Sequence, residues 1–335
     1  MGTTAPLAVS LGDPAGVGPE LIAEAWTRRG EESLSPFVVA GGAHLLAAAA
    51  KARGLILPVQ RVGSLAEAAS VFFQALPVLG ELDGDYRPGE PARESADLAL
   101  ASLTEATRLA TIGEASGVVT GPIAKARLAE VGFNHPGQTE FVAAACGVAA
   151  DDAVMMLAGP SLRTVPLTVH LALAEVPAKL TTELIRRRCA IVATALRSDF
   201  GLENPRLALA ALNPHAGEDG RFGDEERRII APAIAALRAT GIDATGPHPA
   251  DALFAPHARG AYDVALCMYH DQALIPLKAL DFDNGVNVTL GLPVIRTSPD
   301  HGTAFAIAGQ RRANAGATIA ALRLAGECAS RRAAG

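Results

Sequence analysis

The stretch YDVALCMYHDQALIPLK, residues 262–278, contains the pattern that decides the fold. It begins with an apolar run of strand length at residues 264–268, followed by His270 and Asp271 and then by a second apolar stretch that ends at Lys278. Such a run is typical of a buried strand. A histidine and a carboxylate where that strand ends are either core groups satisfied by the backbone or parts of a site.

Apolar runs of this kind recur along the chain and alternate with helical patterns. This alternation predicts a parallel sheet covered on both faces by helices, which is an α/β fold. The expected strands occupy residues 6–12, 37–41, 117–122, 163–170, 206–215 and 262–270. The expected helices occupy residues 96–110, 178–200 and 224–241, and residues 81–95 are expected to form a loop.

Length, composition and charge narrow the class of protein. A chain of 335 residues, half of them hydrophobic, is long enough for about two globular domains. The net charge of −6 offers no global basic field for nucleic acid or for an anionic membrane. Four widely spaced cysteines, no signal peptide and no apolar run long enough to span a membrane predict a soluble, cytoplasmic protein with reduced thiols.

Three histidines share one local setting, because each ends an apolar run of strand length. They are His170, His215 and His270, and the other five histidines of the chain lack this setting. In open parallel sheets, ligands bind beyond the carboxyl ends of the strands. The three imidazoles are therefore candidate ligands of one divalent metal, either zinc, cobalt, manganese or magnesium. The alternative is three unrelated structural histidines.

A group of candidate anion binders follows in the sequence. Lys278, Asn287 and Arg296 combine a point charge, a neutral donor and a guanidinium fork, which suits a phosphate or a carboxylate. Gln138 and Thr139 follow a glycine in NHPGQTEF and lead into an apolar helical pattern. They are either a further anion site or an ordinary helix cap.

Two glycine-containing stretches stand near opposite ends of the chain. SLGDPAGVGPELIAEAW (10–26) has the pattern of a strand, a turn and a helix, and SPDHGTAFAIAG (298–309) stands near the other end of the chain. Neither contains GxGxxG or GxxxxGK[ST], so neither a Rossmann fingerprint nor a P-loop is present. Both resemble the loops with which isopropylmalate and isocitrate dehydrogenases bind NAD(P) without a Rossmann fold.

Longer motifs extend the resemblance. TGPIAKARL, LNPHAGEDGRFGDEE, GPHPADALF, MYHDQALIPLK and GVNVTLGLPVIRTSPDHGTAFAIAG resemble those of the 4-hydroxythreonine-4-phosphate dehydrogenases, the PdxA family. The resemblance runs from about Gly12 to near residue 320. It implies the isocitrate/isopropylmalate dehydrogenase fold, with two α/β/α domains flanking an active-site cleft. The expected domains are residues 1–130 plus 290–335, on the cofactor side, and residues 131–289, on the metal and dimer side.

The resemblance also implies an activity. This is the NAD- or NADP-dependent and metal-dependent oxidation of 4-phosphooxy-L-threonine to 2-amino-3-oxo-4-phosphooxybutanoate. That product decarboxylates to 3-amino-2-oxopropyl phosphate in pyridoxal phosphate (vitamin B6) biosynthesis. The enzyme is expected to be a homodimer with its active site at the subunit interface.

The family's functional residues fall on matching positions of this sequence. The implied metal ligands are His170, His215 and His270, one of them contributed by the partner subunit. The implied substrate contacts are Gln138, Thr139, Lys278, Asn287 and Arg296, and the implied NAD contacts are Asp300, His301 and Gly302. Asp271 and Asp251 are candidates for the catalytic base or for orienting the metal ligands, the alternative being aspartates that cap turns or form ion pairs.

One residue departs from the family. This chain has GQTE where the family usually has GHTE, and glutamine donates hydrogen bonds but carries no charge. A paralogous dehydrogenase of phosphorylated erythronate or threonate, or of a dihydrodiol dicarboxylate, is therefore an alternative. Two alternatives from other classes of protein are a phosphate acyltransferase and a non-catalytic protein that binds metal or nucleotide.

Overall fold

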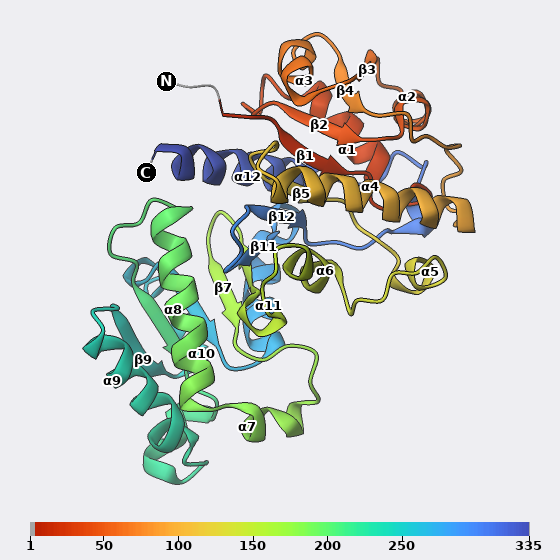
Figure 1. Cartoon of the computed structure of the whole chain (residues 1–335). Coiled ribbons are helices and arrows are strands. Elements are labelled where there is room, and N and C mark those ends of the chain that lie inside the picture. Colours follow the sequence, from red (N-terminus) through yellow and green to blue (C-terminus); the bar gives the residue numbers. More distant parts are fainter. Residues whose placement is uncertain (1–3, 335) are drawn as a thin grey trace. The chain divides into compact units, whose positions relative to one another are not determined.

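The computed structural model describes residues 4–334. The chain divides into two compact units, one running up to Ala153 and again from Leu292, the other formed by Val154–Gly291. The first unit contains residues 131–153, whereas the sequence-based boundaries assign these residues to the second domain. Figure 1 shows the chain coloured from its red N-terminus to its blue C-terminus, with α12 (Gly316–Ala334) as the last helix.

The first unit is built on a parallel sheet of strand order β3-β4-β2-β1-β5-β12. Its central strands are short apolar runs that are buried along their whole length, as expected for a sheet covered on both faces. The strands are β1 (Leu7–Ser10), β2 (Phe37–Ala40), β3 (Val59–Val62), β4 (Leu76–Leu79), β5 (Val118–Thr120) and β12 (Arg296–Pro299).

Helices cover this sheet. α4 packs on β1, β2 and β5, and α12 packs on β12 and β5. The helices are α1 (Gly18–Thr27), α2 (Ala43–Arg53), α3 (Leu65–Val71), α4 (Arg93–Thr111), α5 (Lys125–Ala129), α6 (Gln138–Ala145) and α12, with short 3₁₀ turns at Ala150–Asp152 and Phe305–Ile307. The expected helix over residues 96–110 is confirmed as the centre of α4, and residues 81–92 form the expected loop.

The second unit has a mixed sheet of strand order β11-β6-β7-β10-β8-β9. Its strands are β6 (Val154–Ala158), β7 (Arg163–Pro166), β8 (Leu207–Ala210), β9 (Ala244–His248), β10 (Val264–Cys267) and β11 (Val286–Leu290). β7, β10, β8 and β9 run parallel, whereas β6 is antiparallel to both β7 and β11. The expectation of a purely parallel sheet is therefore wrong at this edge.

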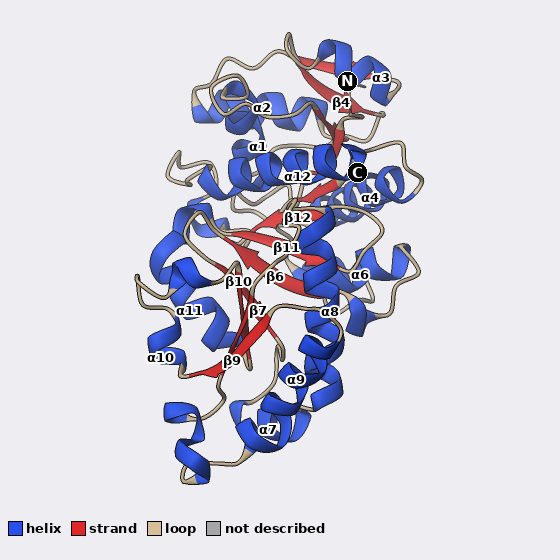
Figure 2. Cartoon of the chain, turned by 90° about the vertical axis from the view of Figure 1, so that its left-hand side faces the viewer, coloured by secondary structure: helices blue, strands red, loops and turns tan. Residues whose placement is uncertain are grey.

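Helices lie on both sides of the second sheet, α10 and α11 on one side and α8 and α9 on the other (Figure 2). They are α7 (Val176–Lys179), α8 (Thr182–Ser198), α9 (Ala231–Ala239), α10 (Ala250–Leu253) and α11 (His270–Asp281). Single 3₁₀ turns lie at Leu173–Glu175, Arg259–Ala261 and Phe282–Asn284, and a π-helical turn at Glu226–Ile230 precedes α9. Pro214–Gly220 is a longer, seven-residue segment that contains left-handed backbone. No helix within residues 4–334 is long and apolar enough to cross a membrane.

Candidate active site

The three histidines follow three neighbouring parallel strands of the second unit. β10 lies between β7 and β8, with Cys267 opposite Pro166 and Leu266 opposite Leu209. His170 follows β7, His215 follows β8 and His270 begins the helix after β10. The prediction that all three stand beyond strand ends of one sheet is therefore confirmed. Such an edge is where parallel sheets place their ligand sites.

His170 and His270 come close together. Their ring centroids are 6.0 Å apart. The hydroxyl of buried Thr168 donates a 2.7 Å hydrogen bond to the carbonyl of Met268, which ties the two strand ends together. The two imidazoles line a cavity of about 260 Å³, whose other lining residues are Thr168, Leu171, Leu173, Val176, Tyr269 and Asp271.

Asp271 holds the ring of His270. Its Oδ1 lies 2.7 Å from His270 Nδ1, which leaves Nε2 as the nitrogen for a ligand. A carboxylate on the far nitrogen of an imidazole fixes its tautomer and its orientation, an arrangement common among metal-bound histidines. The pair His170 and His270, on one cavity and with one ring already oriented, therefore suits two ligands of a divalent metal.

His215 stands apart from this pair in the chain as described. Within residues 4–334, no three His, Cys, Asp or Glu side chains gather closely enough to hold a metal ion. His215 is exposed and has a left-handed backbone, with φ of 52°, as do the residues that follow it up to Asp219. The three-histidine metal site stays a prediction.

Glu226 shapes the loop that carries His215. Its Oε1 accepts hydrogen bonds from the backbone N–H groups of Leu212 and Asn213, at 2.9 and 2.8 Å. Its Oε2 accepts a 3.0 Å hydrogen bond from the Asn213 side chain. The sequence places Glu226 in the helix expected over residues 224–241 and does not single it out, but its side chain is buried against this loop.

Gln272 is a second supporting residue that sequence reasoning does not single out. It is buried, its Oε1 accepts from the N–H of Met268 at 2.7 Å, and its Nε2 donates to the carbonyl of Ala211 at 2.8 Å. These bonds join the ends of β10 and β8. A polar residue at the first turn of an apolar helix, two positions after a candidate ligand, is the signal that could have found it.

The remaining site predictions of this unit lie on separate elements. Lys278 is half-buried on α11, eight residues after His270, and Asn287 lies on β11 opposite Leu157. Asn287 Oδ1 is buried and accepts no hydrogen bond within the described residues. Asp251 is exposed on α10.

The first unit gathers two of the predicted anion binders, Gln138 and Thr139, around a third, Arg296. Its guanidinium is buried, with Nη2 at 2.7 Å from Thr120 Oγ1 and 3.4 Å from Gln138 Oε1. Nη1 lies 3.4 Å from Thr139 Oγ1. Burial lowers the pKa of Arg296 to about 10, an effect partly offset by the charge of Glu140. The group therefore keeps its positive charge at neutral pH.

The start of α6 adds backbone donors to this cluster. Gly137 is its N-cap, and no side chain caps the helix. The first N–H groups of a helix have no intrahelical acceptor, and the helix dipole favours an anion there. Gln138 and Thr139 are the first two residues of α6, so a buried cation and a helix start meet at the predicted anion binders.

The two glycine loops lie against each other in the same unit. The N–H of Val17 donates to the carbonyl of Thr303 at 2.9 Å, and a Cβ added at Gly16 would lie 2.7 Å from that oxygen. Among the residues that the structure describes, two polar atoms of these loops are buried without a hydrogen-bond partner: Asp13 Oδ2 and His301 Nε2. Burial raises the pKa of Asp13, while a hydrogen bond from the N–H of Ala15 and the charge of Arg127 lower it.

These unpartnered atoms fit a ligand with polar edges, as expected at a nucleotide loop. Of the predicted NAD contacts, Asp300 and His301 are half-buried, and Gly302 is exposed with open space where a Cβ would stand. His301 Nδ1 donates to the carbonyl of Gly302 at 2.9 Å. Asp13 is the residue that sequence reasoning passes over here.

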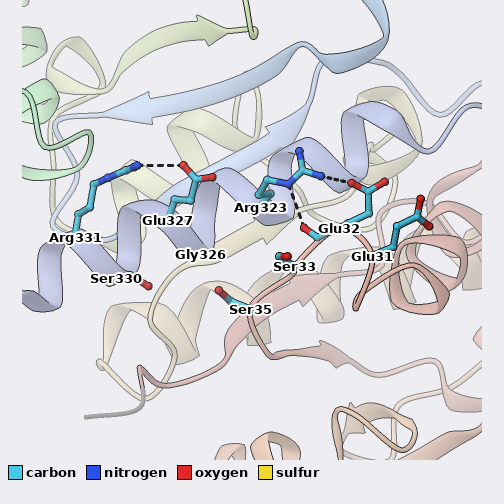
Figure 3. A pocket seen from close by; sticks show the side chains of 9 residues that line it. All are labelled: Glu31, Glu32, Ser33, Ser35, Arg323, Gly326, Glu327, Ser330 and Arg331. Atoms are coloured by element: carbon cyan, nitrogen blue, oxygen red, sulfur yellow. Dashed lines mark hydrogen bonds and ion pairs between the residues drawn. The ribbon is translucent and has the colours of Figure 1, made fainter. Parts of the chain in front are cut away.

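A larger cavity of about 590 Å³ lies elsewhere in the first unit, between residues 31–35 and α12 (Figure 3). Two ion pairs join charged side chains of its lining, Arg323 with Glu32 and Arg331 with Glu327. None of its nine lining residues is a histidine, a cysteine or a lysine. With no such residue in its lining, this cavity is not the candidate active site.

Comparison with known proteins identifies the family of the chain. A profile of the family described as pyridoxal phosphate biosynthetic protein PdxA matches residues 32–325, which include all the predicted site residues. The chain belongs to the PdxA family.

Two PdxA relatives match almost the whole chain. A protein of Erythrobacter litoralis named 4-hydroxythreonine-4-phosphate dehydrogenase is 66% identical over 98% of both chains. The crystal structure of the 4-hydroxythreonine-4-phosphate dehydrogenase of Klebsiella pneumoniae has a TM-score of 0.85 and 38% identity, covering 97% of this chain and 100% of that one. The expected isocitrate/isopropylmalate dehydrogenase-like fold is confirmed by this likeness.

A more distant structure bears on the alternative substrate. The terephthalate 1,2-cis-dihydrodiol dehydrogenase of Burkholderia xenovorans has a TM-score of 0.65 and 30% identity, covering 96% of this chain and 97% of that one. Both measures of likeness are lower than for the PdxA structure.

Proposed function

We propose that this protein oxidises 4-hydroxy-L-threonine 4-phosphate with NAD, yielding 3-amino-2-oxopropyl phosphate after decarboxylation, as a step of pyridoxal phosphate biosynthesis. The observation that carries the proposal is the 66% identity, over 98% of both chains, with a dehydrogenase of that name. The dihydrodiol dehydrogenase reaches only 30% identity. A buried cation at a helix start is the local chemistry that a phosphorylated substrate requires.

The phosphate is the part of the substrate that the first unit binds in this proposal. Arg296 supplies a charge held in a low-dielectric setting, where its attraction for an anion is stronger than in water. Thr139 adds a hydroxyl and the N-terminal N–H groups of α6 add uncharged donors. The resemblance adds Lys278 and Asn287 of the second unit to the substrate contacts.

The metal proposal rests on His170 and His270, with His215 as the third ligand. A divalent cation held there would lower the pKa of the substrate hydroxyl and so ease its oxidation. Asp271 keeps the proton of His270 on Nδ1 and presents Nε2. Asp251, exposed on the helix after β9, is the candidate that would accept the hydroxyl proton.

The cofactor proposal places NAD at the two glycine loops, with Asp300, His301 and Gly302 as contacts. NAD would supply the acceptor for the hydride. The buried, unpartnered atoms of Asp13 and His301 are its proposed polar contacts in this chain. Gly16 keeps the two loops together, because no larger residue fits against Thr303.

We propose a homodimer in which one histidine of each site comes from the partner subunit. The second unit exposes several large apolar side chains: Leu171 at 39%, Leu173 at 64%, Phe222 at 50%, Ile275 at 64% and Phe282 at 72%. Two of these, Leu171 and Leu173, line the cavity of His170 and His270. All four cysteines are free thiols, in keeping with an enzyme of the cytoplasm.

The test is NADH formation from 4-phosphooxy-L-threonine and NAD, followed by absorbance. We expect turnover in the parent protein, loss after chelation with recovery on adding metal, and a fall in kcat of at least about 100-fold for His270→Ala. His257→Ala is the matched control, because His257 is an exposed histidine outside the candidate site. It is expected to match the parent.

Two results would contradict the proposal. A folded, metal-loaded parent that is inert toward the phosphorylated amino acid but oxidises erythronate 4-phosphate or a dihydrodiol dicarboxylate would transfer the assignment to that substrate. Full activity in His270→Ala would return His270 to a structural role.

A further inference from the structure

Thr120 connects the residues of the anion cluster. It is the last residue of β5 and is fully buried. Its hydroxyl accepts a 2.7 Å hydrogen bond from Arg296 Nη2 and donates one to Gln138 Oε1 at 3.4 Å. The hydroxyl thus uses both of its hydrogen-bonding roles within the cluster.

The orientation of the Gln138 amide follows from its partners. Its Nε2 lies 2.9 Å from the carbonyl of Gly121, which can only accept a hydrogen bond. The guanidinium of Arg296 can only donate, and Gln138 Oε1 lies 3.4 Å from its Nη2. Both contacts therefore require the same rotamer, with the amide nitrogen toward the backbone and the oxygen toward Arg296.

We propose that Thr120 and Gln138 are positioning residues that hold the guanidinium of Arg296 in place for the phosphate of the substrate. Thr120 is the stronger of the two, because its contact with Nη2 is short whereas that of Gln138 is at the limit of a hydrogen bond. Gln138 acts through Arg296 in this assignment, which replaces its implied role as a direct substrate contact. The inference rests on the proposed function. It names two residues that determine how tightly the proposed active site binds the phosphate of the substrate.

The physical reason is the freedom of the arginine side chain. An arginine has several rotatable bonds, and fixing them in advance lowers the entropy that substrate binding must overcome. The bond from Nη2 to Thr120 restricts the movement of the guanidinium, and the contact of the same nitrogen with Gln138 restricts it further. The charge then meets the phosphate in one orientation, which a bidentate contact requires.

The test compares Thr120→Val and Thr120→Ser with the parent. Valine keeps the shape of the side chain but loses the hydroxyl, so we expect KM for 4-phosphooxy-L-threonine to rise about tenfold. We expect kcat and the KM for NAD to change less than about twofold. In this assignment Thr120 contacts neither the reacting atoms of the substrate nor NAD. Serine restores the hydroxyl and is expected to bring KM back to within about threefold of the parent.

The matched control is Thr107→Val. Thr107 is a buried threonine on α4 of the same unit, and its hydroxyl has no hydrogen-bond partner within the described residues. Its substitution is expected to leave KM for the substrate unchanged. A merely structural role of Thr120 would instead lower Tm and alter kcat and both KM values together, and that pattern, or an unchanged substrate KM, overturns the proposal.

Binding of inorganic phosphate, measured by calorimetry on the metal-loaded protein, separates this proposal from the function itself. Weaker phosphate binding in Thr120→Val but not in Thr120→Ser supports the positioning role, even if the parent fails to oxidise the phosphorylated amino acid. Equal phosphate affinity in the parent and Thr120→Val overturns it, whatever the substrate. Combined with Gln138→Met, Thr120→Val is expected to cost less than the sum of the two single effects, because both act on Arg296.

Discussion

Arg296 is a cation whose charge stays constant over the working pH range. Burial lowers its pKa from 12.5 to about 10, so the group is protonated below about pH 10 and loses its charge only above that value. Gln138, beside it, does not titrate. The phosphate cluster of this chain should therefore show no ionisation of its own between about pH 6 and 9.

A histidine at position 138 would change this. In Gln138→His the imidazole gains a proton as pH falls, which adds a second positive charge near the phosphate and strengthens its binding. The nearby charge of Arg296 opposes that protonation, so the change should fall below about pH 6.5. We expect the ratio of substrate KM at pH 8 to that at pH 5.5 to exceed the parent's ratio by about threefold or more.

The comparison is made as a ratio to the parent because the phosphate of the substrate titrates near pH 6 in both proteins. Gln74→His is the control, since Gln74 is an exposed glutamine of the same unit outside the cluster. Equal ratios in Gln138→His and in the parent would mean that position 138 lies too far from the bound phosphate to matter.

At the scale of elements, apolar patterning predicts the parallel strands β1, β2, β5, β7, β8 and β10 but misses β3, β4, β9 and β12. The runs ending at His170, His215 and His270 are strands because each must be buried on both faces, and a continuous apolar run is the pattern that such burial requires. β6 is apolar as well and β11 (VNVTL) alternates apolar with polar residues, but neither pattern alone fixes the direction in which a strand pairs. Their antiparallel pairing could therefore not be predicted from the sequence.

The candidate site also contains both residues that the sequence indicates and residues that only the structure reveals. Arg296 and Gln138 carry chemical types that indicate an anion, so sequence alone selects them. Thr120 and Glu226 do not, because a threonine ending a strand and an acid beginning a helix are ordinary in those positions. Only the folded chain brings Thr120 to the guanidinium and Glu226 to the loop before His215.

Glu226 gives an element-scale prediction. In Glu226→Ala the buried N–H groups of Leu212 and Asn213 lose their acceptor, which should lower the free energy of unfolding by about 2–4 kcal/mol. Amide hydrogen exchange at these two residues should speed up more than at β8, because the loop loses its anchor before the strand does. Denaturant unfolding and exchange mass spectrometry measure the two effects.

Asp224→Ala serves as the control, because Asp224 is a half-buried acid at the same helix start and pairs with exposed Arg228. Its loss should change stability by less than about 1 kcal/mol. Equal effects of the two substitutions would show that Glu226 acts as an ordinary acid of the helix start and not as the anchor of the loop.

At the scale of the whole molecule, the positions of the three histidines bear on whether one active site draws its metal ligands from two subunits. His170 and His270 lie 6.0 Å apart between ring centroids, whereas within residues 4–334 no third metal-binding side chain joins them. If the third ligand is the partner's copy of His215, each active site of the proposed dimer draws on two chains. Subunits that are inactive for different reasons should then complement each other.

We therefore expect activity to return when His215→Ala and His270→Ala proteins are mixed and their subunits exchanged. In a hybrid dimer, the His215→Ala chain keeps His170 and His270 and receives an intact His215 from the other chain, so one of its two sites is complete. Random exchange makes half of the dimers hybrid, and the mixture should regain about a quarter of the parent's activity. Mixing His170→Ala with His270→Ala should regain none, because both substitutions fall in the pair supplied by one chain. Complementation in the second mixture, or its absence in the first despite proven exchange, would contradict a site shared in this way.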